Sequence, residues 1–165
     1  MTAFPTAPAP HGPHARRVGW VMTQVLLALV PGALTALAVR GPGVAVNLAL
    51  CLGTAYLCEA GALGLRKRPL GPALRDGSVA VTGVLIALSL PPWLPWALPV
   101  LGTAFAVLFA KHLYGGLGQN PFNPAMAAYA FLLVSFPVAM TRWPAAAAVW
   151  DGALAWKAWI GADMA

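Results

Sequence analysis

The chain has 165 residues, of which 60% are hydrophobic and only 8% are charged, and its net charge at pH 7 is +6. Soluble domains carry about 25% charged residues, so this composition excludes a water-soluble surface and indicates an integral membrane protein. The basic residues fall in short clusters between apolar runs, which favours a role in membrane topology over nucleic-acid binding. The length allows about five or six transmembrane helices of roughly 20 residues each.

The first 17 residues contain four prolines and no apolar periodicity. We expect a flexible tail there and no signal peptide, because no short apolar region is followed by a cleavage site. The first predicted span covers about residues 18 to 39, and Pro31 predicts a break in the middle of it. The second predicted span covers about residues 43 to 65.

Three further apolar segments cover about residues 77 to 92, 94 to 113 and 122 to 140. The first of these ends in the sequence PPWLP, which cannot lie inside a helix, so we expect a broken or re-entrant segment. Residues 145 to 165 are weakly amphipathic and rich in tryptophan, which suits the headgroup region of a bilayer. The sequence therefore predicts an all-α membrane protein with about five spans.

The distribution of lysine and arginine predicts the orientation of these spans. With the N-terminus inside, seven basic residues flank the spans on the inner side and two on the outer side. The inner residues are Arg16, Arg17, Arg66, Lys67, Arg68, Arg75 and Lys111, and the outer ones are Arg40 and Arg142. The positive-inside rule then places the N-terminus in the cytoplasm. The predicted parts are a cytoplasmic tail (1–17), a membrane domain (18–144) and a periplasmic or interfacial segment (145–165).

The loop GGLGQNPFNPA, residues 115 to 125, is unusual in so apolar a chain. Gly116 and Gly118 allow left-handed backbone and close approach to a ligand. Asn120 and Asn123 offer amide groups, and the prolines that follow them suit the first turn of a helix. We predict that the loop presents a helix N-terminus and two amides to a buried ligand. The alternative is a plain turn with an asparagine cap.

Polar residues also lie in or beside the predicted spans. Asp76 or Ser78 is expected to cap the third span, and Thr82 lies four residues after Ser78 on the same helix face. Glu59 is the only acid inside a span. An acid in that position either handles an ion or a proton, or it pairs with the basic residues 66 to 68 about two turns away.

Cys51 and Cys58 are seven residues apart, about 10 Å along a helix, so we expect both thiols to be free. The sequence contains no metal-ligand spacing, no paired carboxylates, no Ser/His/Asp set and no phosphate-binding loop. It gives no support for a metal site, for hydrolysis or for phosphoryl transfer.

The segment RDGSVAVTGVLIALSLPP, followed by KHLYGGLGQNPFNPAMAAYAFLLVSFPVAMTRW, resembles the type-D subunit of the Rnf electron transport complex. It resembles more distantly the type-B subunit of the sodium-pumping NADH:quinone reductase. The resemblance covers roughly residues 18 to 144, and the order of the two motifs makes it specific. It implies half of a urea-transporter-like fold of two five-helix repeats, in the inner membrane of a bacterium. It also implies a subunit of a ferredoxin:NAD-type translocase in which flavins carry electrons, coupled to sodium or proton transport, together with other subunits.

The resemblance also implies where flavin would bind. The flavin-facing candidates are Thr82, Asn120 and Asn123, with Gly116 and Gly118 making room, and the ligand expected there is riboflavin-like. The family also carries FMN, bound through its phosphate to a threonine in an [ST]-x-AT motif. No threonine of this chain stands in that motif. We therefore expect no covalent FMN on these residues, and we expect the chain to be the N-terminal half of a longer protein that does not act alone.

Two other functions stay open. Asn123-Pro124-Ala125 matches the NPA signature of water channels, which favours a small-solute channel or carrier with a half-helix pore. Water channels need two such motifs, and this chain has one. The other alternative is an inert assembly subunit. Flavin content separates the redox function from the channel, because a channel contains none.

Overall fold

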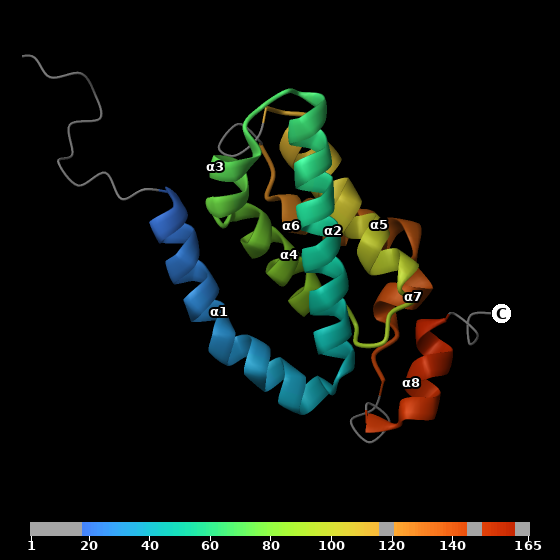
Figure 1. Ribbon diagram of the computed structural model, residues 1–165. Coiled ribbons are helices and arrows are strands. Elements are labelled where there is room, and N and C mark those ends of the chain that lie inside the picture. Colours follow the sequence, from blue (N-terminus) through green and yellow to red (C-terminus); the bar gives the residue numbers. More distant parts are fainter. Residues whose placement is uncertain (1–17, 116–120, 145–149, 161–165) are drawn as a thin grey trace, which may run out of the picture.

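The computed structural model describes residues 18–115, 121–144 and 150–160, and all regular secondary structure in these residues is helical (Figure 1). The helices are α1 (Val18–Arg40), α2 (Gly43–Leu65), α3 (Leu70–Arg75), α4 (Ser78–Ser89), α5 (Ala97–Phe105), the π-helical segment η1 (Ala106–His112), α6 (Pro124–Ser135), α7 (Pro137–Thr141) and α8 (Gly152–Trp159). The prediction of an all-α protein is confirmed.

Within the described residues, α1 and α2 are the helices long and apolar enough to cross a membrane, with 23 residues each. A helix of that length measures about 34 Å, and the hydrocarbon core of a bilayer is about 30 Å thick. The predicted break at Pro31 is wrong, because α1 runs through it without interruption. A proline removes one backbone hydrogen bond, and the rest of the helical ladder of α1 holds the helix together across that gap.

The other predicted spans form shorter apolar helices. α4 and α6 have 12 residues each, about 18 Å, while α5 continues directly into η1. The single predicted span over 122 to 140 is instead two helices, α6 and α7, separated at Phe136. The following proline disfavours helical backbone at Phe136, whose φ and ψ are −134° and 57°. α4 ends at Ser89, so PPWLP lies outside it as predicted.

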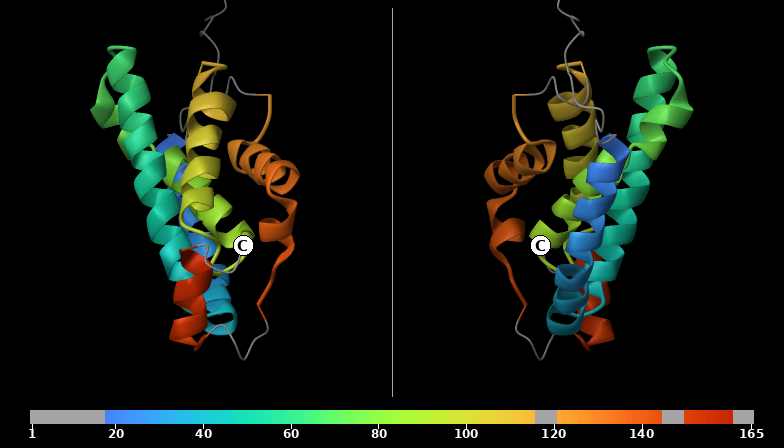
Figure 2. Two further views of the ribbon diagram at one scale, coloured as in Figure 1. Left: turned by 90° about the vertical axis from the view of Figure 1, so that its right-hand side faces the viewer. Right: turned by 90° about the vertical axis from the view of Figure 1, so that its left-hand side faces the viewer.

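The core of the bundle forms where α2 packs against α4 and α5, and where α6 packs against α4, α5 and η1 (Figure 1, Figure 2). Its buried apolar side chains include Cys51, Ile86, Leu90, Leu94, Leu98, Leu132 and Met140. Gly102 allows α5 and α6 to approach closely, since a Cβ there would lie 2.5 Å from Leu132 Cδ1. Cys51 and Cys58 are both free, as their spacing predicts.

The C-terminal end of α4 is fixed by two hydrogen bonds from neighbouring residues. Asn47 Nδ2 on α2 donates to the Pro91 carbonyl at 2.9 Å, and the Arg40 guanidinium donates to the Leu88 carbonyl at 3.1 Å. α4 is much shorter than α2, so fixing one end leaves its other end beside the middle of the bundle (Figure 1). The N-terminus of α4 therefore lies inside the protein, where its first residue, Ser78, is buried.

The edges of the bundle are apolar. α1 lies along the outside with none of its residues buried (Figure 2). α8 lies beside the start of α5, where Trp96 N donates to the Trp159 carbonyl at 3.2 Å. Exposed side chains of these two helices include Leu27, Leu34, Val39 and Trp156. A surface of this kind suits contact with lipid, and with the long apolar helices it identifies a membrane protein.

Candidate functional site

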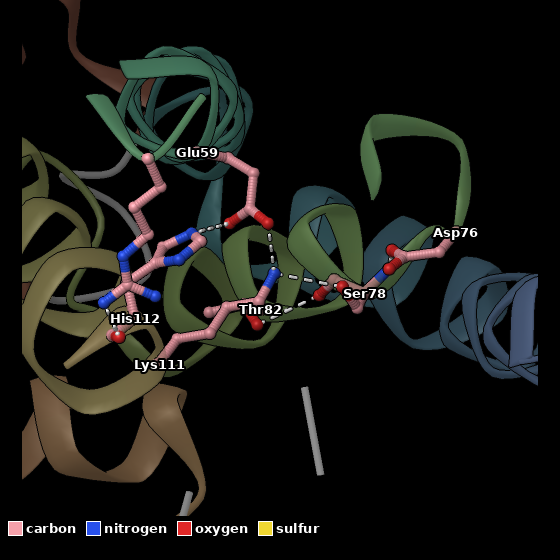
Figure 3. Close-up of polar contacts among 7 residues, drawn as sticks. Glu59, Asp76, Ser78, Thr82, Lys111 and His112 are labelled. Carbon is pink, nitrogen blue, oxygen red and sulfur yellow. Dashed lines mark hydrogen bonds and ion pairs between the residues drawn. The ribbon is translucent and has the colours of Figure 1, made fainter. Parts of the chain in front are cut away.

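Five buried polar side chains, here called the Glu59 cluster, lie where α2, α4 and η1 meet (Figure 3). The cluster consists of Glu59, Ser78, Thr82, Lys111 and His112. Glu59 is 2% exposed and Lys111 is 3% exposed. Burying an ion costs several kcal/mol unless the ion is paired and hydrogen-bonded. The contacts within the cluster must therefore offset the cost of burying Glu59 and Lys111.

Both carboxylate oxygens of Glu59 are engaged. Oε1 accepts a hydrogen bond from Lys111 Nζ at 2.9 Å, and Oε2 lies 3.0 Å from His112 Nε2. Lys111 Nζ also donates to Ser78 Oγ at 3.0 Å, and Thr82 Oγ1 donates to the Ser78 carbonyl at 3.0 Å. The network thus links three helical elements through one carboxylate and one ammonium group.

The π-helical backbone of η1 explains how two consecutive residues face the same carboxylate. Leu113 N donates to the Leu108 carbonyl, five residues back, at 3.1 Å. This turn is wider than that of an α-helix, so it narrows the angle between the side chains of Lys111 and His112. The Arg66 guanidinium donates to the His112 carbonyl and fixes the end of the segment.

The start of α4 is built by Asp76 and Gly77. Asp76 Oδ1 accepts from Ser78 N at 2.8 Å, and Gly77 has a left-handed φ of 77°. The N-cap position of α4 is Gly77, so the predicted cap at Asp76 or Ser78 is wrong, and Asp76 binds Ser78 N from the position before the cap. The hydroxyl of Ser78 is left to meet Lys111.

Two sequence predictions about these charges are wrong. Glu59 does not pair with residues 66 to 68, because its partners come from η1. The sequence places Lys111 among the cations of an inner loop, whereas the structure buries it against Glu59. Removing Lys111 from the seven inner basic residues leaves six, against Arg40 and Arg142 on the outer side and Lys157 in the predicted periplasmic or interfacial segment. The inner side still carries more basic residues, so the prediction of a cytoplasmic N-terminus is unchanged.

Beside the Glu59 cluster lies a pocket of about 320 Å³. Its walls come from α1, from the starts of α4 and α6, and from η1. The polar lining residues are Ser78, Thr82, Lys111 and Asn123, and apolar lining comes from Met22 and Leu85 among others. Sites for small molecules begin at about 300 Å³ and combine apolar walls with a few polar groups. The pocket has that character.

Two of the predicted site residues, Thr82 and Asn123, meet at this pocket. Asn123 also caps α6, because its Oδ1 accepts from Ala125 N at 3.0 Å and Pro124 occupies the first helical position. The predicted helix start after the loop is therefore confirmed. The side chain serves as a cap through its oxygen, and no partner of its amide nitrogen is found within the described residues. Three predicted residues, Gly116, Gly118 and Asn120, lie outside the described residues.

Positive and negative groups both lie at the pocket. The N-terminus of α6 borders it and carries roughly half a positive charge from the helix dipole, and the ammonium group of Lys111 lines it. The carboxylates of Asp76, on Ser78 N, and of Glu59, on Lys111, compensate part of the positive charge. The described residues hold no group of three or more His, Cys, Asp or Glu side chains that could bind a metal ion. The hydrogen-bond donors of the pocket suit an organic ligand with carbonyl oxygens.

Sequence reasoning missed Lys111 and His112. A basic pair at the end of an apolar run looks like a membrane boundary, and the Glu59 partner lies about fifty residues away in the chain. The available signal was the unpaired acid itself, since a charge inside a span requires a partner. Lys111 and His112 are the basic residues closest in the chain to the loop over residues 115 to 125.

A comparison with protein families decides the relationship. Residues 5–163 match the model of the NQR2, RnfD, RnfE family. The chain belongs to this family. A protein of Pseudomonas aeruginosa (strain LESB58), named as the type-D subunit of an ion-translocating oxidoreductase complex, is 56% identical over 140 residues, which is 83% of this chain and 41% of that protein.

Relatives of the same name in two Aeromonas species are equally similar. The protein of Aeromonas salmonicida is 56% identical over 140 residues, covering 85% of this chain and 40% of the relative. The protein of Aeromonas hydrophila is 54% identical over 150 residues, covering 90% of this chain and 43% of the relative. The resemblance stated from the sequence is confirmed, and the chain spans about two fifths of the length of these relatives.

Proposed function

We propose that the pocket between the starts of α4 and α6 binds the ring system of a non-covalent, riboflavin-like flavin, and that the protein takes part in electron transfer in an ion-translocating membrane complex. One observation carries the proposal: Thr82 and Asn123, from separate helices, line one pocket together with the buried Lys111. A bound flavin supplies the redox chemistry, while the protein supplies its position and its electrostatic surroundings.

The polar atoms of the pocket fit the edge of an isoalloxazine ring, which alternates carbonyl oxygens with a ring N–H. Thr82 gives its hydroxyl proton to the Ser78 carbonyl, so its Oγ1 is available as an acceptor. Lys111, the Ser78 hydroxyl and the Asn123 amide nitrogen can donate. The apolar lining suits the faces of an aromatic ring. Gly116, Gly118 and Asn120 stay candidates from the sequence alone, because they lie outside the described residues.

The names of the relatives support a role in a multi-subunit complex, since each is named as a subunit of an ion-translocating oxidoreductase complex. We therefore propose that the other subunits of an Rnf-type translocase are the partners of this protein. Electron transfer through the flavin would be coupled to sodium or proton transport. The FMN-attachment motif [ST]-x-AT does not occur in these 165 residues, so the proposed flavin is held without a covalent bond.

The proposed arrangement in the membrane follows the predicted parts. Residues 1–17 form a cytoplasmic tail, residues 18–144 form the membrane domain, and residues 145–165 lie in or near the periplasmic interface. Six inner basic residues outnumber the three outer ones, Arg40, Arg142 and Lys157, which supports an N-terminus in the cytoplasm of a bacterium. Short α4 and α6, whose N-termini border one pocket, support half of a urea-transporter-like fold.

Flavin content tests the proposal. The protein is purified from its own membranes, and its absorbance spectrum is recorded before and after denaturation, together with its intact mass. We expect flavin to be released on denaturation and this chain to carry no flavin adduct. The absence of any flavin would contradict the proposal and favour the small-solute channel or the assembly subunit. A flavin adduct on these residues would contradict the non-covalent site.

A further inference from the structure

We propose that Lys111 orients the carbonyl edge of the flavin and stabilises the negative charge that the ring gains on reduction, with Glu59 and His112 as the residues that position it. This inference rests on the proposed flavin site. It assigns a role to a buried charge that the choice of Thr82 and Asn123 leaves unexplained.

The hydrogen bonds of Lys111 leave one donor for a ligand. An ammonium group has three N–H bonds. One goes to Glu59 Oε1 at 2.9 Å and one to Ser78 Oγ at 3.0 Å. No further partner of Lys111 is found in the described residues, and Lys111 itself lines the pocket. The third N–H is therefore available to an acceptor in the pocket.

The geometry of the ion pair directs its positive end toward the ligand. Glu59 does not line the pocket, whereas Lys111 and Ser78 do. Its second oxygen is held by His112 at 3.0 Å, so the carboxylate cannot turn toward the pocket without losing that contact. Asp76, the acid nearest the start of α4, is engaged by the backbone of Ser78 and does not line the pocket either.

A cation in this place has a redox consequence. An electron that enters the flavin ring without a proton leaves one extra negative charge on it. A cation fixed beside the ring, together with the N-terminus of α6, lowers the energy of that charge more than a group surrounded by water would. The reduced form should therefore bind more tightly than the oxidised form, which is equivalent to a raised midpoint potential.

The test compares the unchanged protein with the double variant Glu59→Gln/Lys111→Met. Both charges are removed together, because Lys111→Met alone leaves a buried carboxylate uncompensated and endangers folding. Lys157→Met, on the exposed surface of α8, is the matched control. Lys111→Arg keeps the charge and tests for rescue of the potential.

The measurements use the full-length protein, purified with the proteins that assemble with it and stripped of dissociable flavin. Riboflavin is titrated back to obtain its Kd. The midpoint potential of the bound ring is then recorded spectroscopically, with dithionite as the electron donor and water as the proton source for the two-electron reduction.

We expect the double variant to bind oxidised riboflavin about tenfold more weakly, as for the loss of one hydrogen bond to a charged group. We expect its reduced form to lose about a further tenfold, which for a two-electron couple lowers the midpoint potential by about 30 mV. Lys157→Met should change neither value. An unchanged midpoint potential in the double variant overturns this inference even if binding weakens. Failure of the unchanged protein to bind riboflavin overturns the proposed function, and this inference with it.

Discussion

Glu59 binds two basic groups that follow one another in the chain, with its two oxygens 2.9 Å from Lys111 Nζ and 3.0 Å from His112 Nε2. All three side chains are buried. A paired ion in the interior is expensive to break, because the remaining partner keeps its desolvation cost without compensation. The residue that sequence reasoning singles out as an acid in a span is thus the anchor of the site wall.

Stability of the single and double variants should show this coupling. Glu59→Gln and Lys111→Met are each expected to lower the free energy of unfolding by about 3–5 kcal/mol, since each leaves one buried charge unpaired. The double variant should lose clearly less free energy of unfolding than the two single variants lose together. Thermal unfolding in detergent measures the three variants against the unchanged protein. Strictly additive losses would show that the two groups do not interact.

Asn123 has one observed role, as a helix cap, and one proposed role, as a ligand donor. Asn123→Asp keeps the oxygen that accepts from Ala125 N but removes the amide donor. We expect it to retain the stability of the protein and to reduce flavin occupancy. Asn123→Ala should reduce both, with a stability loss of about 1 kcal/mol. Flavin released on denaturation, per mole of protein, measures occupancy, and full occupancy in both variants would remove Asn123 from the site.

Thr82 is tested by an isosteric change. Thr82→Val removes the hydroxyl that lines the pocket and keeps the shape of the side chain. We expect lower flavin occupancy in Thr82→Val and normal occupancy in Thr82→Ser, which keeps the hydroxyl. Equal occupancy in the two variants would argue that Thr82 only packs against the pocket.

The helices differ in how well the sequence predicts them. α2 begins and ends where the sequence places it, because a long apolar run stops at a basic cluster. Local rules are less reliable at prolines: Pro31 leaves α1 intact, whereas Pro137 separates α6 from α7. The π-helical turn of η1 has no local signal in the sequence, and its contacts with Glu59 join residues about fifty positions apart.

Close packing of α5 on α6 provides a test at the level of elements. Gly102→Val would place carbon atoms within 3 Å of the fully buried Leu132, so we expect a destabilisation of about 1–3 kcal/mol. The control is Gly61→Val on α2, because a Cβ at Gly61 meets nothing within 4 Å. Thermal midpoints compare the two variants. Equal midpoints would contradict the tight contact between these helices.

The molecule as a whole shows which part of the site the sequence could predict. Thr82 and Asn123 were identifiable from their motifs, and the structure brings them to one pocket. The wall formed by Lys111 and Ser78 was not identifiable, because it arises from contacts between helices distant in the chain. Hydrophobic periodicity fixes which face of a helix is buried, but it does not tell which residue of another helix lies opposite.

The proposed orientation can be tested on the intact protein. Cys51 and Cys58 are first replaced by alanine. Lys67→Cys, after α2, and Pro144→Cys, after α7, then introduce single thiols, and the C-terminal ends of these two helices lie toward opposite ends of the bundle (Figure 1). In right-side-out membranes, a membrane-impermeant maleimide should label residue 144 and not residue 67. The reverse pattern would place the N-terminus outside the cytoplasm.

The most direct measurement of the central claim is an experimental density map of the protein purified with its native ligands. We predict planar density in the pocket between the starts of α4 and α6, with its polar edge against Lys111, Ser78 and Thr82 and near the Asn123 amide. A pocket filled only by solvent, in a preparation that contains flavin bound elsewhere, would contradict the account.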